Sequence, residues 1–343
     1  AQAVFGTSRL KLDLVLDEWL RIVSISGTSS MKIVRWSLAA LTFRLELLLL
    51  VNDVVEGALI RKGDCNRSYG VTASALRLTQ AWQQAWQDEN LNFSEHVPNR
   101  SYITMLTGDG ASFVQGLQAL GVSLRNTETK YPLVVLMTQT PAKSVRETLK
   151  CLKLPLIQIP SIANPDTGAG RYSTTYSKLV IWSLPSERVV WLDADTVVQQ
   201  NIDDLFRRPA VPFAAGPDCG WACLRDSFNS GVMVVEPSHV VFTRMMSQLG
   251  ALQSRDKGDQ GFLNAFFNKW TLDTNAQLDI EYNVLKRLEP KPEFQATFRH
   301  AKVIHNVGMK PWVHSEDDKI YPKSHAAWRA AEDQYFAQCR ARG

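Results

Sequence analysis

The sequence predicts an α/β fold with a mostly parallel, Rossmann-like central sheet and helices on both of its faces. The first observation is a series of continuous apolar runs, which is the pattern of strands buried on both faces. The second is the spacing of apolar residues between these runs, which has the period of a helix. Strand and helix therefore alternate along the chain, as they do in parallel sheets. The apolar runs span residues 102–107, 132–138, 154–160 and 188–192.

The segments between the apolar runs are predicted to be the covering helices. In the first of them, Leu117, Leu120 and Leu124 fall on one face of a helix. The second half of the chain is less regular, and its helices and strands alternate less clearly. Further helices are predicted over residues 142–152, 174–184, 239–252, 258–270 and 325–339, and further strands within 228–238 and from residue 302.

Composition limits the function classes that the chain can belong to. The chain has 343 residues, of which 45% are apolar and 21% charged, as in ordinary globular proteins. Its formal net charge is only +4 and it has no long basic run, so we expect no nucleic-acid partner. We expect residues 1–97 to form a separate N-terminal region and residues 98–343 to form the catalytic domain.

The N-terminal region has the form of a targeting segment. Positive charge after Met31 precedes two apolar runs, SLAALTF and LELLLLV, so residues from about 31 to 57 have the form of a secretory signal or a membrane anchor. Arg44 and Glu46 interrupt the runs, so an amphipathic helix remains an alternative. N-x-S sequons at Asn66, Asn92 and Asn99 follow this segment. They favour a stem in the Golgi or secretory lumen, with a cytoplasmic location as the alternative.

The cysteines give no clear signal. There are five, so they cannot all pair within the chain. Cys219 and Cys223 lack the spacing and the histidine pair of a zinc knuckle. We interpret the cysteines as mostly incidental, and a disulfide that involves Cys219 or Cys223 stays open.

Two aspartates directly follow the last apolar run, in the sequence VVWLDAD. Ligands of such sheets bind beyond the carboxyl ends of the strands. Three interpretations of the two acids compete. Asp193 and Asp195 hold a hard cation such as Mn²⁺ or Mg²⁺, or Asp193 is the nucleophile of a haloacid-dehalogenase-like phosphatase. In the third, both acids simply end a solvated strand. The sheet that precedes the motif counts against the phosphatase, whose motif opens its domain. The other two interpretations stay open at this point.

Further motifs follow in an order that carries a family resemblance. DAD is followed by FNSG at 228–231, GDQG at 258–261 and HNVGMKPW at 305–312. With these motifs the chain resembles the family 8 glycosyltransferases from about residue 100 to 315. The resemblance implies a GT-A fold, a divalent ion that is usually Mn²⁺, a UDP-sugar donor, a carbohydrate, polyol or glycoprotein acceptor, and retention of anomeric configuration.

The resemblance also implies roles for individual residues. Asp193, Asp195 and His305 resemble the metal ligands, and Lys310 resembles the lysine that contacts the diphosphate and acts in catalysis. Asp259 and Gln260 resemble the catalytic pair beside the anomeric carbon. The remaining donor-binding positions are Thr107, Phe113, Lys178, Ala194, Asn229, Ser230 and Gly308.

The chain departs from the glycogenin branch of the family at one point. Glycogenin glucosylates a tyrosine in its own chain, downstream of a YN dipeptide. Here no tyrosine lies between Tyr282 and Tyr321, and Pro290 falls near the expected acceptor. We therefore expect no self-glucosylation of this kind. A non-catalytic nucleotide-sugar-binding module and a homodimer remain open alternatives.

Overall fold

The computed structural model describes residues 97–166, 170, 173–219, 223, 226–313 and 318–340. The chain divides into two units, residues 1–68 and 69–343, and all described residues belong to the second. The predicted targeting segment and the sequons at Asn66 and Asn92 lie outside the described residues. The predicted domain boundary after residue 97 therefore stays a prediction.

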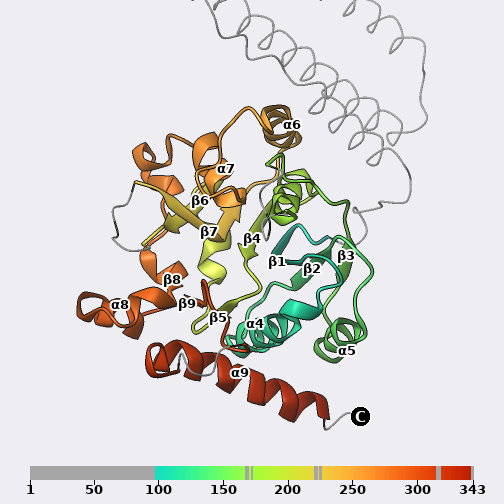
Figure 1. Cartoon of the computed structure of the whole chain (residues 1–343), viewed down its shortest axis with the longest axis vertical. Helices are drawn as coiled ribbons and strands as arrows, with labels where there is room; N and C mark the ends of the chain where they lie inside the picture. Colours follow the sequence, from blue (N-terminus) through green and yellow to red (C-terminus); the bar gives the residue numbers. More distant parts are fainter. Residues whose placement is uncertain are drawn as a thin grey trace, which may run out of the picture. The chain divides into compact units, whose positions relative to one another are not determined.

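The described residues contain a six-stranded sheet whose order confirms the predicted fold class. The strands run β3-β2-β1-β4-β7-β6 across the sheet (Figure 1). The pairings from β3 to β4 are parallel, whereas β7 runs antiparallel to both of its neighbours. Their bounds are β1 Arg100–Leu106, β2 Leu133–Met137, β3 Leu156–Gln158, β4 Arg188–Leu192, β6 Phe213–Pro217 and β7 Phe228–Val235.

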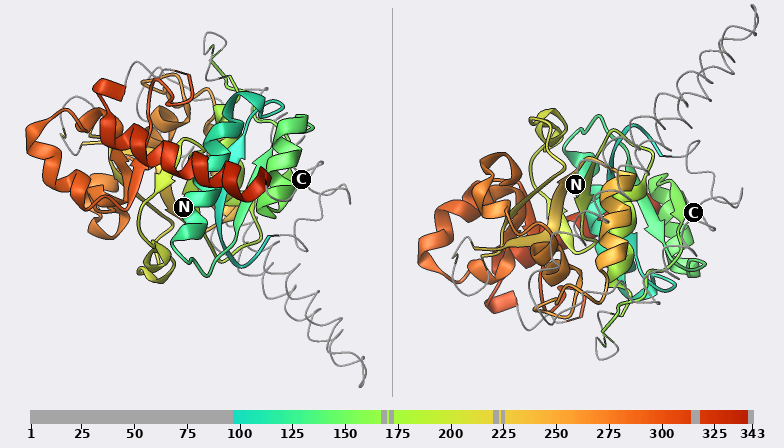
Figure 2. Two further views of the ribbon diagram at one scale, coloured as in Figure 1. Left: turned by 90° about the horizontal axis from the view of Figure 1, so that it is seen from below. Right: turned by 90° about the horizontal axis from the view of Figure 1, so that it is seen from above.

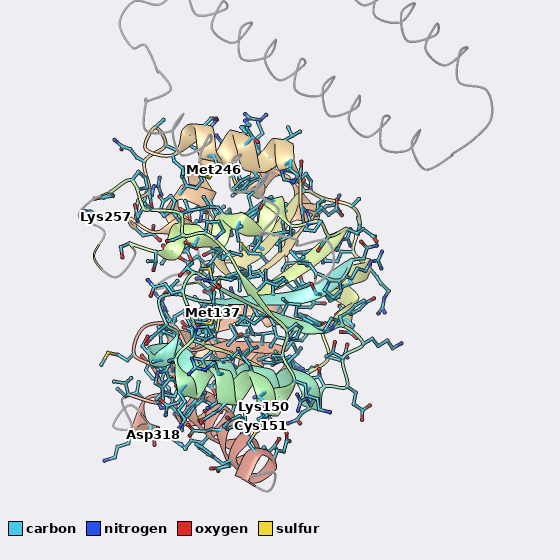
Figure 3. All side chains as sticks on the ribbon, turned by 90° about the vertical axis from the view of Figure 1, so that its right-hand side faces the viewer. Met137, Lys150, Cys151, Met246, Lys257 and Asp318 are labelled. Atoms are coloured by element: carbon cyan, nitrogen blue, oxygen red, sulfur yellow. A yellow bond between two sulfur atoms is a disulfide. The ribbon has the colours of Figure 1, made fainter. Side chains whose placement is uncertain are left out.

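Helices cover both faces of this sheet, as the apolar runs predicted. Tyr102 and Val190 pack against α4, while their neighbours Ile103 and Trp191 face the opposite layer. Figure 3 shows Met246 of α6 and Cys151 of α5 on opposite sides of the sheet. The covering helices are α4 Val114–Asn126, α5 Lys143–Leu152, α6 His239–Gln248, α7 Asp259–Phe266 and the 3-10 helix η4 Thr175–Ser183.

A second, three-stranded sheet in the described residues was not predicted. It has the order β5-β9-β8, with bounds β5 Thr196–Val198, β8 Val284–Leu285 and β9 Val303–His305. β5 begins directly after the DAD motif and pairs antiparallel with β9, so that Thr196 lies opposite His305. This pairing brings the histidine motif beside the aspartate motif, although the two are far apart along the chain.

The structure refines two sequence-based predictions. The helix predicted over 174–184 is present as the 3-10 helix η4. The strand predicted within 228–238 begins at Phe228, so the polar residues of FNSG lie inside the buried strand β7. Polar side chains are tolerated there because residues at the start of α7 hydrogen-bond to them.

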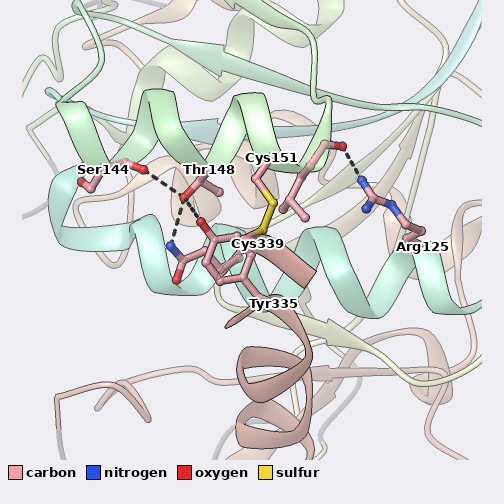
Figure 4. Close-up of a disulfide and its surroundings, with 8 residues drawn as sticks. Arg125, Ser144, Thr148, Cys151, Tyr335 and Cys339 are labelled. Atoms are coloured by element: carbon pink, nitrogen blue, oxygen red, sulfur yellow. Dashed lines mark hydrogen bonds between the residues drawn. A yellow bond between two sulfur atoms is a disulfide. The ribbon is translucent and has the colours of Figure 1, made fainter. Parts of the chain in front are cut away.

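The C-terminal helix α9, Pro322–Arg340, packs across α4 (Figure 2). A disulfide between Cys151 of α5 and Cys339 of α9 fastens it, beside a hydrogen-bonded pair of Thr148 and Tyr335 (Figure 4). A second disulfide joins Cys219 and Cys223. The interpretation of the cysteines as incidental was therefore wrong for Cys151 and Cys339, while the disulfide left open for Cys219 or Cys223 is present. Among the described residues, no helix is long and apolar enough to span a membrane.

Candidate active site

The DAD motif forms the turn between the two sheets. The backbone N–H of Asp193 donates to the carbonyl of Gly231 at 2.8 Å, and both N–H and hydroxyl of Thr196 donate to the Asp193 carbonyl. Trp191 donates its indole N–H to the Asp193 carboxylate at 2.7 Å. These bonds hold the chain at the end of β4, where ligands of such sheets bind.

His305 completes a cluster with the two aspartates. The N–H of Asn306 donates to the Asp195 carbonyl at 2.9 Å, continuing the pairing of β5 and β9 past the strand end. His305 Nε2 then lies 3.2 Å from a carboxylate oxygen of Asp195 and 3.7 Å from one of Asp193. One potential ligand atom from each of these three residues lies within 4.8 Å of the others, and the described residues hold no second group of this kind.

This cluster fits a divalent cation. Two carboxylates and an imidazole are an oxygen-rich set of donors that suits Mn²⁺, and the imidazole suits Mg²⁺ less well. Asp195 and His305 are buried, while the Asp193 side chain is 27% exposed. The cluster is therefore rigid on one side and open to ligands on the other. Across the wider site, three carboxylates including Asp259 face the ammonium groups of Lys178 and Lys310, which leaves negative charge for a cation to balance.

Lys310 lies on the other side of Asp195. Its ammonium group forms an ion pair with the Asp195 carboxylate and donates to the Asn306 carbonyl at 3.2 Å. Burial alone would raise the pKa of Asp195, but Lys310 and His305 outweigh this effect and lower that pKa. Asp195 is thus an anion at any physiological pH.

The loop that carries Lys310 packs against the start of α4. The Lys310 ammonium lies 5.7 Å from the ring centre of Phe113, whose ring also meets Trp312 edge to face. Gly308 has φ +75°, a left-handed conformation that favours glycine. Gly116 allows the close packing, because a Cβ there would lie 2.4 Å from the Ala194 carbonyl oxygen.

Lys178 is a buried cation at the centre of the site. Its ammonium lies 3.1 Å from Asp193 and 2.7 Å from Asp259, and donates to the hydroxyl of Ser230 at 3.2 Å. Burial alone would lower the pKa of Lys178, but the attraction of the two carboxylates outweighs it and raises that pKa. Lys178 therefore links the metal side of the site to the start of α7.

A network of hydrogen bonds joins FNSG to GDQG. Asn229 donates through Nδ2 to Gln260 Oε1 at 2.9 Å, and the Ser230 hydroxyl donates to Asp259 at 3.0 Å. Gln260 in turn donates through Nε2 to Asp218 at 3.0 Å. The structure thus brings together the four residues that were predicted to surround the donor sugar.

Two predicted donor-binding residues lie apart from this network. Thr107 follows β1, the strand beside β4, and its carbonyl closes a turn with the N–H of Gly110. Ala194 is buried and packs with Leu106 and Leu117 beneath the DAD turn. Their contacts in the structure are those of a turn and of the core.

Sequence reasoning missed three residues that support the site. Asn283 contacts both His305 and Asn229, and Asp218 contacts Gln260. Gly231 was quoted within a motif but given no role, yet a Cβ there would lie 2.1 Å from His305 Cε1. Asp218 shows no signal of its own in a single sequence, and the motifs that contain Asn283 and Gly231 do not indicate their supporting roles, since each acts through a neighbour in space.

Comparisons with known proteins agree on one class. The pattern described as glycosyl transferase family 8 matches residues 115–216 and 223–316. Glycogenin-1 of Oryctolagus cuniculus is 34% identical over 234 residues, which are 65% of this chain and 68% of that protein. UDP-glucuronate:xylan alpha-glucuronosyltransferase 2 of Arabidopsis thaliana is 33% identical over 258 residues, 73% of this chain and 41% of that protein.

A solved structure agrees with the fold. The apo structure of the bifunctional glycosyltransferase WbbM superposes with a TM-score of 0.50 at 16% identity, over 69% of this chain and 51% of that one. The sheet order and this superposition show that the chain has the GT-A fold. The chain belongs to glycosyltransferase family 8. This membership leaves the phosphatase interpretation of Asp193 without support.

Proposed function

We propose that this chain is a metal-dependent, retaining glycosyltransferase that moves a sugar from a UDP-sugar to a carbohydrate, polyol or glycoprotein acceptor. The observation that carries the proposal is the meeting of Asp193, Asp195 and His305, whose ligand atoms lie within 4.8 Å of one another. These three residues would hold Mn²⁺, with Mg²⁺ as a weaker alternative. The ion supplies positive charge at the donor diphosphate.

The residues of the chain have distinct tasks in this proposal. Lys310, beside Asp195, places an ammonium group where charge grows on the departing diphosphate, and its effect is greatest in the transition state. Asn229 and Gln260 orient the donor sugar with their side-chain amides, which hold each other in place by a hydrogen bond. The Phe113 ring, beside Lys310, supplies an apolar face for the uracil.

Asp259 orients the sugar and stabilises positive charge at the anomeric carbon. The Asp259 oxygen that contacts Lys178 at 2.7 Å also accepts from Ser230 at 3.0 Å. A carboxylate oxygen held by two donors is a poorer nucleophile than a free one. With this oxygen occupied by Lys178 and Ser230, the proposed displacement places the leaving diphosphate and the acceptor on one face of the sugar, without a covalent intermediate on Asp259.

A screen of UDP-sugars without acceptor tests the function. UDP-glucose, UDP-galactose, UDP-glucuronate and UDP-xylose are each incubated with the protein, with Mn²⁺ or with EDTA. We expect slow hydrolysis of at least one donor, dependent on Mn²⁺, and no hydrolysis of phosphomonoesters. Binding of UDP-sugars without hydrolysis or transfer would instead support a non-catalytic module.

The same incubations test the absence of self-glucosylation. The Tyr282 hydroxyl is engaged with Asp204 and with Lys302, so it is not presented as an acceptor. We expect the mass of the protein to stay unchanged after incubation with each donor. A hexose found on one of its own tyrosines would contradict this part of the proposal.

The disulfides support a lumenal location for the chain. The chain forms two disulfides, Cys151–Cys339 and Cys219–Cys223. Disulfides form and persist in oxidising compartments and are rare in cytosolic proteins. Asn99 of the third sequon is exposed, as a glycosylated asparagine must be. We expect alkylation without reduction to spare these four cysteines, and a glycan-removing enzyme to lower the mass of the secreted protein. Labelling of Cys151 and Cys339 in protein from its native host would contradict the location.

A further inference from the structure

Asn283 joins the two halves of the site and has no role in the function proposed so far. It ends the short helix η8, Ile280–Asn283, immediately before β8, and only 1% of its surface is exposed. Its Nδ2 donates to Asn229 Oδ1 at 2.8 Å, and its Oδ1 lies 3.0 Å from His305 Nδ1. One buried amide thus touches both a metal-ligand histidine and a residue on the sugar side.

Backbone groups fix the direction of every hydrogen bond around this amide. The N–H of Gly231 can only donate, and it donates to Asn229 Oδ1 at 2.9 Å. The N–H of Ser230 likewise donates to Gln260 Oε1, the oxygen that also accepts from Asn229 Nδ2. The Asn229 side chain must therefore point its oxygen toward Asn283, and the NH₂ group of Asn283 must donate to that oxygen.

The direction of these bonds decides the state of His305. Since the Asn283 NH₂ group faces Asn229, its oxygen faces His305 Nδ1, and an amide oxygen can only accept. Nδ1 therefore carries a hydrogen, and the nitrogen left for an ion is Nε2. Nε2 is the nitrogen that lies 3.2 Å from the Asp195 carboxylate. A hydrogen bond of this kind to the far nitrogen orients metal-ligand histidines in proteins.

Gly231 packs closely against the same ring. A Cβ at this position would lie 2.1 Å from Cε1 and 2.3 Å from Nδ1 of His305. The imidazole therefore contacts both the Gly231 backbone and the Asn283 amide, and these contacts limit its rotation.

We propose that Asn283 is a positioning residue that sets the tautomer and the orientation of His305 for metal binding and couples this ligand to the donor-sugar side through Asn229. The inference rests on the metal site of the proposed function. In this proposal the metal ligand and the donor-sugar side are coupled through one chain of hydrogen bonds, which runs from His305 through the amides of Asn283, Asn229 and Gln260.

The test measures Mn²⁺ binding rather than turnover. The dissociation constant of Mn²⁺ is determined by electron paramagnetic resonance, without and with UDP, for the wild type and for Asn283→Ala. We expect the variant to bind Mn²⁺ about 10- to 100-fold more weakly, as for other residues that orient a metal ligand. A purely structural role would lower the melting temperature and leave the Mn²⁺ affinity of the folded protein unchanged.

Asn283→Asp separates the two contacts of the amide. A carboxylate still accepts from His305 Nδ1 but cannot donate to Asn229 Oδ1. We expect Mn²⁺ to bind this variant at least as tightly as the wild type, whereas the KM for the UDP-sugar rises. Should Asn283→Ala fail to fold, this split between Mn²⁺ affinity and KM still tests the proposal.

Tyr282→Phe is the matched control. It removes a hydrogen-bonding group from the preceding residue, whose hydroxyl contacts Asp204 and Lys302 instead of the site. We expect its Mn²⁺ affinity to equal that of the wild type. Wild-type affinity in folded Asn283→Ala, or an unchanged KM in Asn283→Asp, would overturn the role of Asn283. A wild type that binds no Mn²⁺ even with UDP would overturn the metal site itself.

Discussion

Asp195→Asn should reduce sugar transfer by about a thousandfold or more, because losing a charged metal ligand removes roughly 4 kcal/mol of transition-state stabilisation. The amide keeps the size of the side chain but not its charge. Asp195 is buried, contacts His305 Nε2 at 3.2 Å and pairs with Lys310, so two groups lose their anionic partner at once. The measurements are the transfer rate at increasing Mn²⁺ and the Mn²⁺ dissociation constant.

Asp204→Asn is the control for this variant. Asp204 follows the same motif, but its side chain is 42% exposed and pairs with Lys302 at 3.4 Å, away from the cluster. We expect it to keep its transfer rate and Mn²⁺ affinity. Circular dichroism should show that both variants are folded. Wild-type turnover in Asp195→Asn would remove the basis of the metal assignment.

The sequence predicted the parts of the fold whose signal is local. A strand buried on both faces is mostly apolar, and Leu133–Met137 and the residues that follow Arg188 in β4 lie where such runs occur. The strand Phe213–Pro217 reads FAAGP, which has no such signal. It forms because it pairs with β7, which is itself held between two neighbours.

The second sheet was harder to predict from the sequence than the first. Its strands Thr196–Val198 and Val284–Leu285 are too short to have a recognisable period, and the strand predicted from residue 302, Val303–His305, carries no sign of its partners. Each is stabilised only by partners that are distant in sequence. Because this sheet places His305 beside Asp195, the geometry of the cluster could be expected from the family resemblance but not from the residues alone.

In the candidate site, too, residues with a local sequence motif could be predicted, whereas residues that act through distant contacts could not. The motif residues Asp193, Asp195 and His305 could be named from the sequence, and the structure brings them together. The role of Asn283 could not, since the YN dipeptide that contains it indicates nothing about a contact with His305. The Cys151–Cys339 disulfide is hidden for a similar reason: its sequence separation is 188, and only the packing of α9 against the body brings the cysteines together.

Lys178→Met should destabilise the protein more than any surface substitution. The ammonium lies between Asp193 and Asp259, and its side chain is only 6% exposed. Removing one partner of a buried ion pair leaves uncompensated charge and costs about 3–5 kcal/mol. For a domain of this size the melting temperature should fall by roughly 10 °C. Lys143→Met is the control, because Lys143 is 83% exposed, and we expect no measurable change in its melting temperature.

The pH dependence of this variant separates lost charge compensation from lost packing. The raised pKa of Lys178 means that the wild type keeps the ammonium throughout the neutral and acidic range, and that the stabilising effect of this charge is lost only as the pH rises through the raised pKa. In Lys178→Met the stability deficit should therefore shrink as the pH rises above about 10, the ordinary pKa of a lysine. Lys178→Met combined with Asp259→Asn should regain much of the stability at neutral pH while transfer stays lost. A double variant that regains no stability, with a deficit that stays constant at alkaline pH, would show that Lys178 acts through its packing alone, and the electrostatic link between the metal side and α7 would then have to be abandoned.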